Sequence, residues 1–151
     1  MQIEVTERPW DDADATTLRT AQRAEIDARY GPGSEPGPAP TAADVAVFLV
    51  AHSGGEPVGC GALRRLDDGS AEIKRMYVIP GMRGSGVSTA VLEALENHAA
   101  ERGWFTLKLE TGPKQPEAIR FYERSGYVRI PNFGHYAGHE DSLCFARELR
   151  G

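Results

Sequence analysis

The chain has 151 residues, of which 40% are hydrophobic and 26% are charged, and its formal net charge is −5. These values are typical of one globular domain with a sizeable core, so we expect residues 1–151 to form a single domain. The negative charge argues against nucleic acid or an anionic membrane as the main partner, and no apolar run is long enough to span a bilayer.

Two further features bear on the cellular location. The N-terminus lacks the basic and apolar regions of a signal peptide. Cys60 and Cys144 are too few for a disulfide framework, and buried free thiols in a reducing cytoplasm are the simplest interpretation. We therefore expect a cytoplasmic protein.

The first part of the chain predicts a strand, a helix and a sheet. Residues 2–8 alternate between apolar and charged side chains, as in a half-buried strand, and residues 13–30 have helical spacing behind an acidic first turn. Residues 31–40 contain four prolines and three glycines, so they can continue neither a helix nor a central strand. We interpret this segment as a connector or, alternatively, as a lid on the substrate side. Three antiparallel strands follow, at residues 46–52, 57–66 and 70–79.

The last of these strands runs through Met76-Tyr77-Val78 into a glycine-rich turn and a helix over residues 87–102. Gly84 and Gly86 permit positive φ and close approach of a ligand. The first amides of the helix lack intrahelical partners, and the helix dipole makes that end positive. Such a structure binds phosphate, and the Arg83 guanidinium suits phosphate oxygens.

The spacing of this turn excludes two common phosphate-binding motifs. A Walker loop needs a lysine directly after the glycines, and none is present. A dinucleotide fingerprint needs a third glycine or alanine, where this chain has Thr89. A strand-to-helix turn without any ligand is the simpler alternative.

The rest of the chain adds a crossover and two more strands. The helix ends at Gly103, and the strand at residues 104–111 should lie parallel to the strand at 70–79. Pro116 opens a short helix that ends at Arg124. Strands at residues 127–130 and 143–149 then enclose a loop.

Two segments resemble the GNAT N-acetyltransferase superfamily. Arg83-Gly84-Ser85-Gly86-Val87-Ser88 is similar to its acetyl-CoA pyrophosphate loop, with Ser88 in place of the usual Gly or Ala. The segment from Gln115 to Tyr127 resembles the signature Asn-x-x-Ala-x-x-x-Tyr-x-x-x-Gly-Phe, with Gln115 replacing Asn. Three further segments resemble a bacterial subgroup: Leu109-Glu110-Thr111-Gly112-Pro113-Lys114-Gln115-Pro116-Glu117-Ala118, Phe133-Gly134-His135-Tyr136 and Ser142-Leu143-Cys144-Phe145.

This resemblance implies the GNAT fold of the α/β class, a mixed, mostly antiparallel twisted sheet of about seven strands with helices on both faces. It also implies that the strand ending at Val78 separates from its neighbour to receive pantetheine, and that the Val78 N–H polarises the acetyl carbonyl. The residues expected to bind acetyl-CoA are Met76, Tyr77, Val78, Arg83, Gly84, Ser85, Gly86, Val87, Ser88, Thr89, Gln115 and Tyr122.

Acetyl transfer to an amine also requires an acid and a base. Tyr122 occupies the position of the family's general acid and could protonate the leaving thiolate. A core aromatic at helical spacing is the alternative. Glu72, on the strand leading to the acetyl site, is the first candidate for the base, and Glu110 is the second; either carboxylate could instead be solvated or salt-bridged.

Residues 20–45 and the loop at residues 131–141 are expected to form most of the substrate pocket, with the loop as one of its walls. Tyr136 and Glu140 could contact a cationic substrate, as could Glu110. His135 and His139 have the spacing of a metal pair, but a loop containing glycine does not fix two imidazoles on one face. We therefore expect no metal.

The predicted function is transfer of acetyl from acetyl-CoA to a primary amine of a small molecule or peptide. A transferase for longer acyl-CoA and a non-catalytic acyl-CoA sensor are the alternatives. The last strand is expected to expose its edge, which makes a homodimer plausible.

Overall fold

Helices and strands follow the predicted order in the computed structural model, which describes residues 2–33 and 39–149. Residues 34–38, within the segment predicted to be a connector or a lid, lie outside the described residues. The strands are β1 (Glu4–Glu7), β2 (Val47–Ser53), β3 (Glu56–Arg65), β4 (Ala71–Val78), β5 (Thr106–Thr111), β6 (Val128–Ile130) and β7 (Leu143–Glu148). The helices are α1 (Ala13–Tyr30), α2 (Val87–Glu101) and α3 (Pro116–Arg124), with 3-10 turns at Pro80–Met82 and Gly134–Tyr136.

The strands form one seven-stranded sheet in the order β1-β2-β3-β4-β5-β7-β6. β4 and β5 are parallel, because α2 carries the chain back between them, and the other neighbouring strands are antiparallel. The predicted mixed sheet is confirmed. One expectation was wrong: β7 lies between β5 and β6, so the last strand has no exposed edge, and β1 and β6 are the edge strands.

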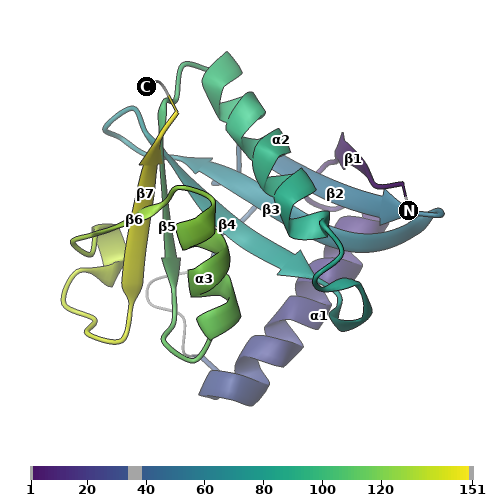
Figure 1. The fold of residues 1–151 in the computed structure, drawn as a ribbon, viewed down its shortest axis with the longest axis horizontal. Coiled ribbons are helices and arrows are strands. Elements are labelled where there is room, and N and C mark those ends of the chain that lie inside the picture. Colours follow the sequence, from purple (N-terminus) through teal and green to yellow (C-terminus); the bar gives the residue numbers. More distant parts are fainter. Residues whose placement is uncertain (1, 34–38, 150–151) are drawn as a thin grey trace.

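Helices cover both faces of the sheet, as predicted. In Figure 1, α2 and α3 lie in front of the sheet and α1 lies behind it. The larger apolar cluster includes Val91 and Leu95 of α2 and Tyr122 of α3. A second cluster includes Leu18 of α1 and Phe48 of β2 on the other face.

Close packing of α2 on β3 depends on Gly61. A Cβ at this position would lie 2.7 Å from Met76 Sδ and 2.9 Å from both Leu95 Cδ1 and Val91 Cγ1. These distances are too short for carbon contacts, so any larger residue must push the helix away from the sheet.

Gly61→Ala is therefore expected to destabilise the fold by about 1–3 kcal/mol through overpacking. Thermal unfolding should show a Tm lower by roughly 2–12 °C for a chain of this size. Gly81→Ala is the control, since nothing lies within 4 Å of the added Cβ. Equal Tm values for the two variants would contradict the close-packing interpretation.

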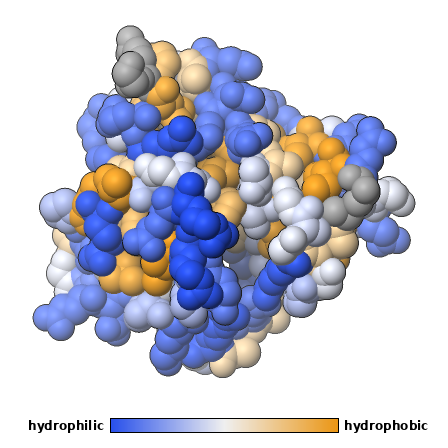
Figure 2. Space-filling model, viewed as in Figure 1, coloured by the Kyte–Doolittle hydropathy of each residue, from blue (hydrophilic) through white to orange (hydrophobic). Residues whose placement is uncertain are grey.

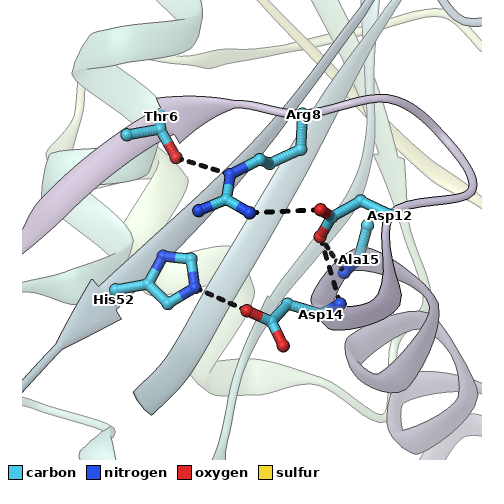
Figure 3. A network of polar contacts seen from close by, with 6 residues as sticks. All are labelled: Thr6, Arg8, Asp12, Asp14, Ala15 and His52. Carbon is cyan, nitrogen blue, oxygen red and sulfur yellow. Dashed lines mark hydrogen bonds and ion pairs between the residues drawn. The ribbon is translucent and has the colours of Figure 1, made fainter. Parts of the chain in front are cut away.

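The start of α1 is fixed by polar contacts with β1 and β2 (Figure 3). Asp12 caps the helix by accepting from the amides of Asp14 and Ala15, each at 3.1 Å. Arg8 donates to Asp12 at 3.1 Å, and His52 of β2 contacts Asp14 at 2.8 Å. The hydrogen bonds from these backbone amides, chiefly that of Ala15, lower the pKa of Asp12, so the capping carboxylate stays ionised. These contacts hold α1 in a fixed position against the sheet.

The surface is mainly hydrophilic on the face shown in Figure 2, where hydrophobic residues form separate patches. Val128 on the edge strand β6 is the large hydrophobic side chain that is clearly exposed, at 64%. Among the described helices, none is long and apolar enough to cross a membrane.

Candidate active site

The site is organised by a bulge in β4 and by the separation of β4 from β5. Cys60 pairs with Tyr77 and Ala62 pairs with Lys74, so two residues of β4, Arg75 and Met76, stand opposite one residue of β3. Pairing between β4 and β5 is confined to their first residues, Ala71 with Leu107 and Glu72 with Lys108. The separation implied by the resemblance is therefore present.

A cavity of about 820 Å³ lies at this separation. Its size is sufficient for a small-molecule ligand. One side is lined by parts of α1 and by residues 73–76 of β4. The other side is lined by residues 109–115, which follow the last β5 residue paired with β4, by α3, and by the 3-10 turn and loop before β7. Among the predicted site residues, those that line it are Met76, Glu110, Gln115, Tyr122 and Tyr136.

The backbone of β4 presents polar groups to the opening. The Ile79 amide donates to the Val58 carbonyl of β3 at 3.0 Å, so alternation along the strand turns the N–H and C=O of Val78 away from β3. On that same side the Val78 carbonyl accepts from Arg83 Nε at 3.0 Å, and the Met76 carbonyl accepts from Gln22 Nε2 at 2.9 Å. The Val78 N–H thus has the direction needed for a carbonyl bound in the opening.

The glycine-rich turn has the predicted backbone. Gly84 and Gly86 adopt φ values of 78° and 96°, and a Cβ at either position would point into open space. Gly86 is the N-cap of α2 and provides no side-chain cap, so the exposed start of the helix presents its amides to solvent. Ser85 Oγ donates to the Met82 carbonyl, which stabilises the turn. This geometry suits an anion.

Arg83 has a more specific position than its sequence context indicated. Its Nη2 donates to both carboxylate oxygens of Glu25 on α1, at 2.8 and 3.0 Å, and its Nε contacts Val78 as described above. The guanidinium therefore connects the turn, the end of β4 and α1.

Tyr122 of α3 is both a core residue and a cavity residue. It is 6% exposed, and its ring packs against the rings of Phe121 and Tyr127 at centroid distances of 5.2 and 5.7 Å. Burial raises the pKa of Tyr122 well above its usual range, so its hydroxyl stays protonated. The interpretations of Tyr122 as a core aromatic and as a general acid are thus compatible.

Glu72 is fully buried and does not line the cavity itself. Arg64 donates to its Oε1 at 2.6 Å, and the Tyr136 hydroxyl donates to its Oε2 at 2.6 Å. Lys74 Nζ donates to the Tyr136 oxygen at 2.9 Å. Since Tyr136 lines the cavity, it connects Glu72 to the site.

Glu110, the second candidate base, lines the cavity directly and accepts from Ser142 Oγ at 2.8 Å. Glu140 is exposed and is not among the lining residues; Asp141 and His139 take that place in the wall. The remaining predicted acetyl-CoA contacts, Tyr77, Val78 and residues 83–89, lie outside the cavity lining. The predicted acetyl-CoA contacts thus divide among the cavity, the end of β4 and the turn at the start of α2.

Several cavity residues were not singled out individually from the sequence, although residues 20–45 were predicted to contribute to the substrate pocket. They belong to α1 and to the β4 bulge, which carry no recognisable motif; the helical spacing of the α1 residues was their only signal. They are Arg19, Gln22, Arg23, Tyr30 and Arg75.

The cysteines and the acidic and histidine residues show no sign of other chemistry. Cys60 is buried, which raises the pKa of its thiol to about 12. Burial also raises the pKa of the Cys144 thiol. Neither thiol is therefore activated as a nucleophile. Within residues 2–33 and 39–149, no group of three or more His, Cys, Asp or Glu side chains is arranged to hold a metal ion.

Comparison with known proteins identifies the family. Residues 8–127 match the model of the acetyltransferase (GNAT) family. A protein named IAA acetyltransferase from Azospirillum brasilense is 38% identical over 103 residues, which are 68% of this chain and 67% of that protein. The chain therefore belongs to the GNAT acetyltransferase family.

Solved structures have the same fold. A Klebsiella pneumoniae protein assigned to the acyl-CoA N-acyltransferases superposes with a TM-score of 0.83 at 31% identity, covering 98% of both chains. A GNAT acetyltransferase from Elizabethkingia anophelis, solved with acetyl-CoA bound, superposes with a TM-score of 0.72 at 16% identity, covering 97% of this chain and 98% of that one.

Proposed function

We propose that this protein is an N-acetyltransferase that moves the acetyl group of acetyl-CoA to a primary amine of a small molecule or peptide, by direct attack in a ternary complex. The observation that carries the proposal is the separation of β4 from β5, which leaves the Val78 N–H directed away from β3 on the strand whose residues 73–76 line the cavity. A thioester in this opening would have its carbonyl beside that N–H and its phosphates at the start of α2.

The chain's own residues would then perform three tasks. The amides of residues 83–88 hold the pyrophosphate, and the Val78 N–H stabilises the negative charge that develops on the acetyl oxygen. Tyr122 donates its proton to the thiolate as the carbon–sulfur bond breaks and the carbon–nitrogen bond forms. The proton that the new amide nitrogen loses restores the Tyr122 phenol. The incoming ammonium brings one further proton, which a base must accept before the nitrogen can attack.

We propose that Glu72 accepts this proton through Tyr136. The phenol oxygen takes the proton of the ammonium while its own proton passes over 2.6 Å to Glu72 Oε2. Lys74 holds the phenol oxygen in place. Glu110 faces the cavity directly and is the alternative base; in the relay scheme it orients the amine instead.

Two other functions remain as alternatives. A longer acyl chain would need additional apolar volume beyond the acetyl position, and an acyl-CoA sensor would not need a buried hydroxyl at Tyr122. We favour an enzyme over a sensor because both Tyr122 and Tyr136 line the same cavity. Free buried thiols at Cys60 and Cys144 suit a reducing compartment, so we propose a cytoplasmic enzyme.

The test is a calorimetric titration with acetyl-CoA, with CoA and ADP as comparison ligands, followed by assays of CoA release with a panel of amines. Saturable one-to-one binding of acetyl-CoA supports the proposal, and CoA release distinguishes an enzyme from a sensor. No binding at about millimolar ligand, a weak affinity of only ~4 kcal/mol, would exclude the proposed function.

Arg83→Ala is expected to weaken acetyl-CoA binding about 10- to 100-fold, because charge-assisted hydrogen bonds contribute about 1.5–3 kcal/mol. Glu25→Gln is the matched variant, since it removes the ion pair that holds Arg83 without removing the guanidinium. If Arg83 contacts phosphate directly, Glu25→Gln should keep or improve the affinity for acetyl-CoA. Equal weakening in both variants would show that Arg83 acts by tying the turn to α1.

A further inference from the structure

Charge is divided within the cavity. Arg19 and Arg23 lie one turn apart on α1, and Arg75 lies at the β4 bulge; all three side chains line the cavity. The carboxylates in the lining, Glu110 and Asp141, belong to β5 and to the loop before β7. The charged lining residues of α1 and β4 are therefore all basic, although Arg23 lies 3.8 Å from Asp27 Oδ1, whereas Glu110 and Asp141 stand opposite them beside a single lysine, Lys114.

Arg19 is held in a partly desolvated position. Its Nη1 donates to the Trp10 carbonyl at 2.6 Å, and its guanidinium lies 3.7 Å from the centre of the Trp10 ring. Burial lowers the pKa of Arg19, and the nearby charge of Arg75 acts in the same direction, while the carboxylate of Asp11 opposes them in part. Among the described residues, no carboxylate lies within ion-pair distance of Arg19. An anion in the cavity would supply the missing counter-charge.

Arg75 has an unusual backbone. Its φ is 60°, and it is the non-glycine residue with positive φ in the described chain. This conformation is strained for a residue with a side chain, whereas glycine adopts it freely. The presence of arginine at this position indicates that the side chain serves the cavity that it lines.

The phosphates of acetyl-CoA do not account for these arginines. The start of α2, where the proposed function places the pyrophosphate, contributes no residue to the cavity lining. The arginines instead line the same cavity as Tyr136 and Glu110, at the walls formed by α1 and β4. These arginines therefore suit a second anionic group, which would belong to the acceptor.

We propose that the acceptor is an amino carboxylate, whose carboxylate binds Arg19 and Arg75 while its amine lies near Tyr136 and Glu110. This inference rests on the proposed function, since it names the substrate class of the same site. Arg23, one turn further along α1, extends the basic wall for an acceptor with a longer backbone. The planar guanidinium fork suits a carboxylate in particular.

The test compares three matched series in the CoA-release assay: the common amino acids, their methyl esters and the corresponding decarboxylated amines. The best amino acid is expected to exceed its methyl ester and its amine by about 100-fold in kcat/KM, as for loss of a charge-assisted contact. Arg19→Met and Arg75→Gly should each reduce this preference about tenfold or more, chiefly through KM. Arg65→Met, an exposed arginine on β3 outside the cavity, is the control.

The outcomes separate this inference from the proposed function. Acetyl-CoA binding together with equal or better turnover of esters and amines would overturn the carboxylate subsite and keep the acetyltransferase. Acetyl-CoA binding without turnover of any amino acid would also overturn it. If the preference persists in both Arg19→Met and Arg75→Gly, the carboxylate is bound elsewhere. Failure to bind acetyl-CoA would reject both proposals.

Discussion

Replacing Tyr122 with phenylalanine is expected to lower kcat by about 100-fold or more, the usual contribution of a positioned general acid. Acetyl-CoA affinity should change by less than about twofold, because the ring remains packed in the core and only a hydroxyl is lost. The measurement is steady-state kinetics with the best acceptor, combined with calorimetric binding of acetyl-CoA. A kcat within about threefold of the parent enzyme would remove Tyr122 from the mechanism.

The control for this variant is Tyr127→Phe. Tyr127 packs against Tyr122, and its hydroxyl donates to Glu96 rather than lining the cavity. The control therefore removes a buried hydroxyl from the same aromatic cluster without touching the proposed proton path. A similar loss of kcat in both variants would indicate disturbed packing.

The raised pKa of Tyr122 gives the same variant a pH signature. A phenol whose pKa lies above its ordinary value of about 10 keeps its proton through the alkaline range. The parent enzyme should therefore show no loss of kcat up to about pH 10 that can be assigned to this acid. The raised pKa makes the phenol a weaker acid, and the transfer remains feasible because the same burial raises the proton affinity of a thiolate beside it.

The sequence predicted the elements and the glycine-rich turn because these depend on local signals. Gly84 and Gly86 determine the backbone at the turn, and the apolar stripe of residues 87–99 determines which face of α2 is buried. The motif from Gln115 to Tyr127 correctly placed Tyr122 on a helix at the cavity.

What the sequence could not predict depends on the tertiary fold. The bulge at Arg75 arises from the pairing of β4 with β3, and nothing in the local sequence marks it. The basic wall needs α1 to lie along the cavity beside β4, so the sequence placed Arg23 only within the broad pocket range 20–45 and gave no role to Arg19. The positions of β6 and β7 in the sheet could also not be predicted from the sequence, because a short strand can pair on either side of its neighbour.

The burial of Glu72 changes how a base can work in this site. A carboxylate with Arg64 on one oxygen and Tyr136 on the other has no direct access to the acceptor. The ion pair of Glu72 with Arg64 would by itself be structural, but the Tyr136 phenol connects Glu72 to the cavity. Tyr136 therefore distinguishes a relay from a purely structural network.

Tyr136→Phe is expected to lower kcat/KM about 100-fold near pH 7, because it removes the hydroxyl between the amine and Glu72. The loss should shrink about tenfold per pH unit toward pH 10, as alkaline solution supplies an acceptor amine that is already neutral. The pH profile of kcat/KM measures this, with Glu72→Gln expected to show the same trend if it stays folded. Thermal unfolding of each variant separates lost catalysis from lost stability.

Glu110→Gln is the matched comparison, since it removes the other carboxylate that lines the cavity. If the proton leaves through Tyr136, this variant should mainly raise KM and keep the pH profile of the parent enzyme. A pH-dependent loss in Glu110→Gln, with a normal profile in Tyr136→Phe, would identify Glu110 as the base. Glu72 would then serve to position Tyr136 and Lys74, and the buried carboxylate would stabilise the pocket wall without accepting a proton.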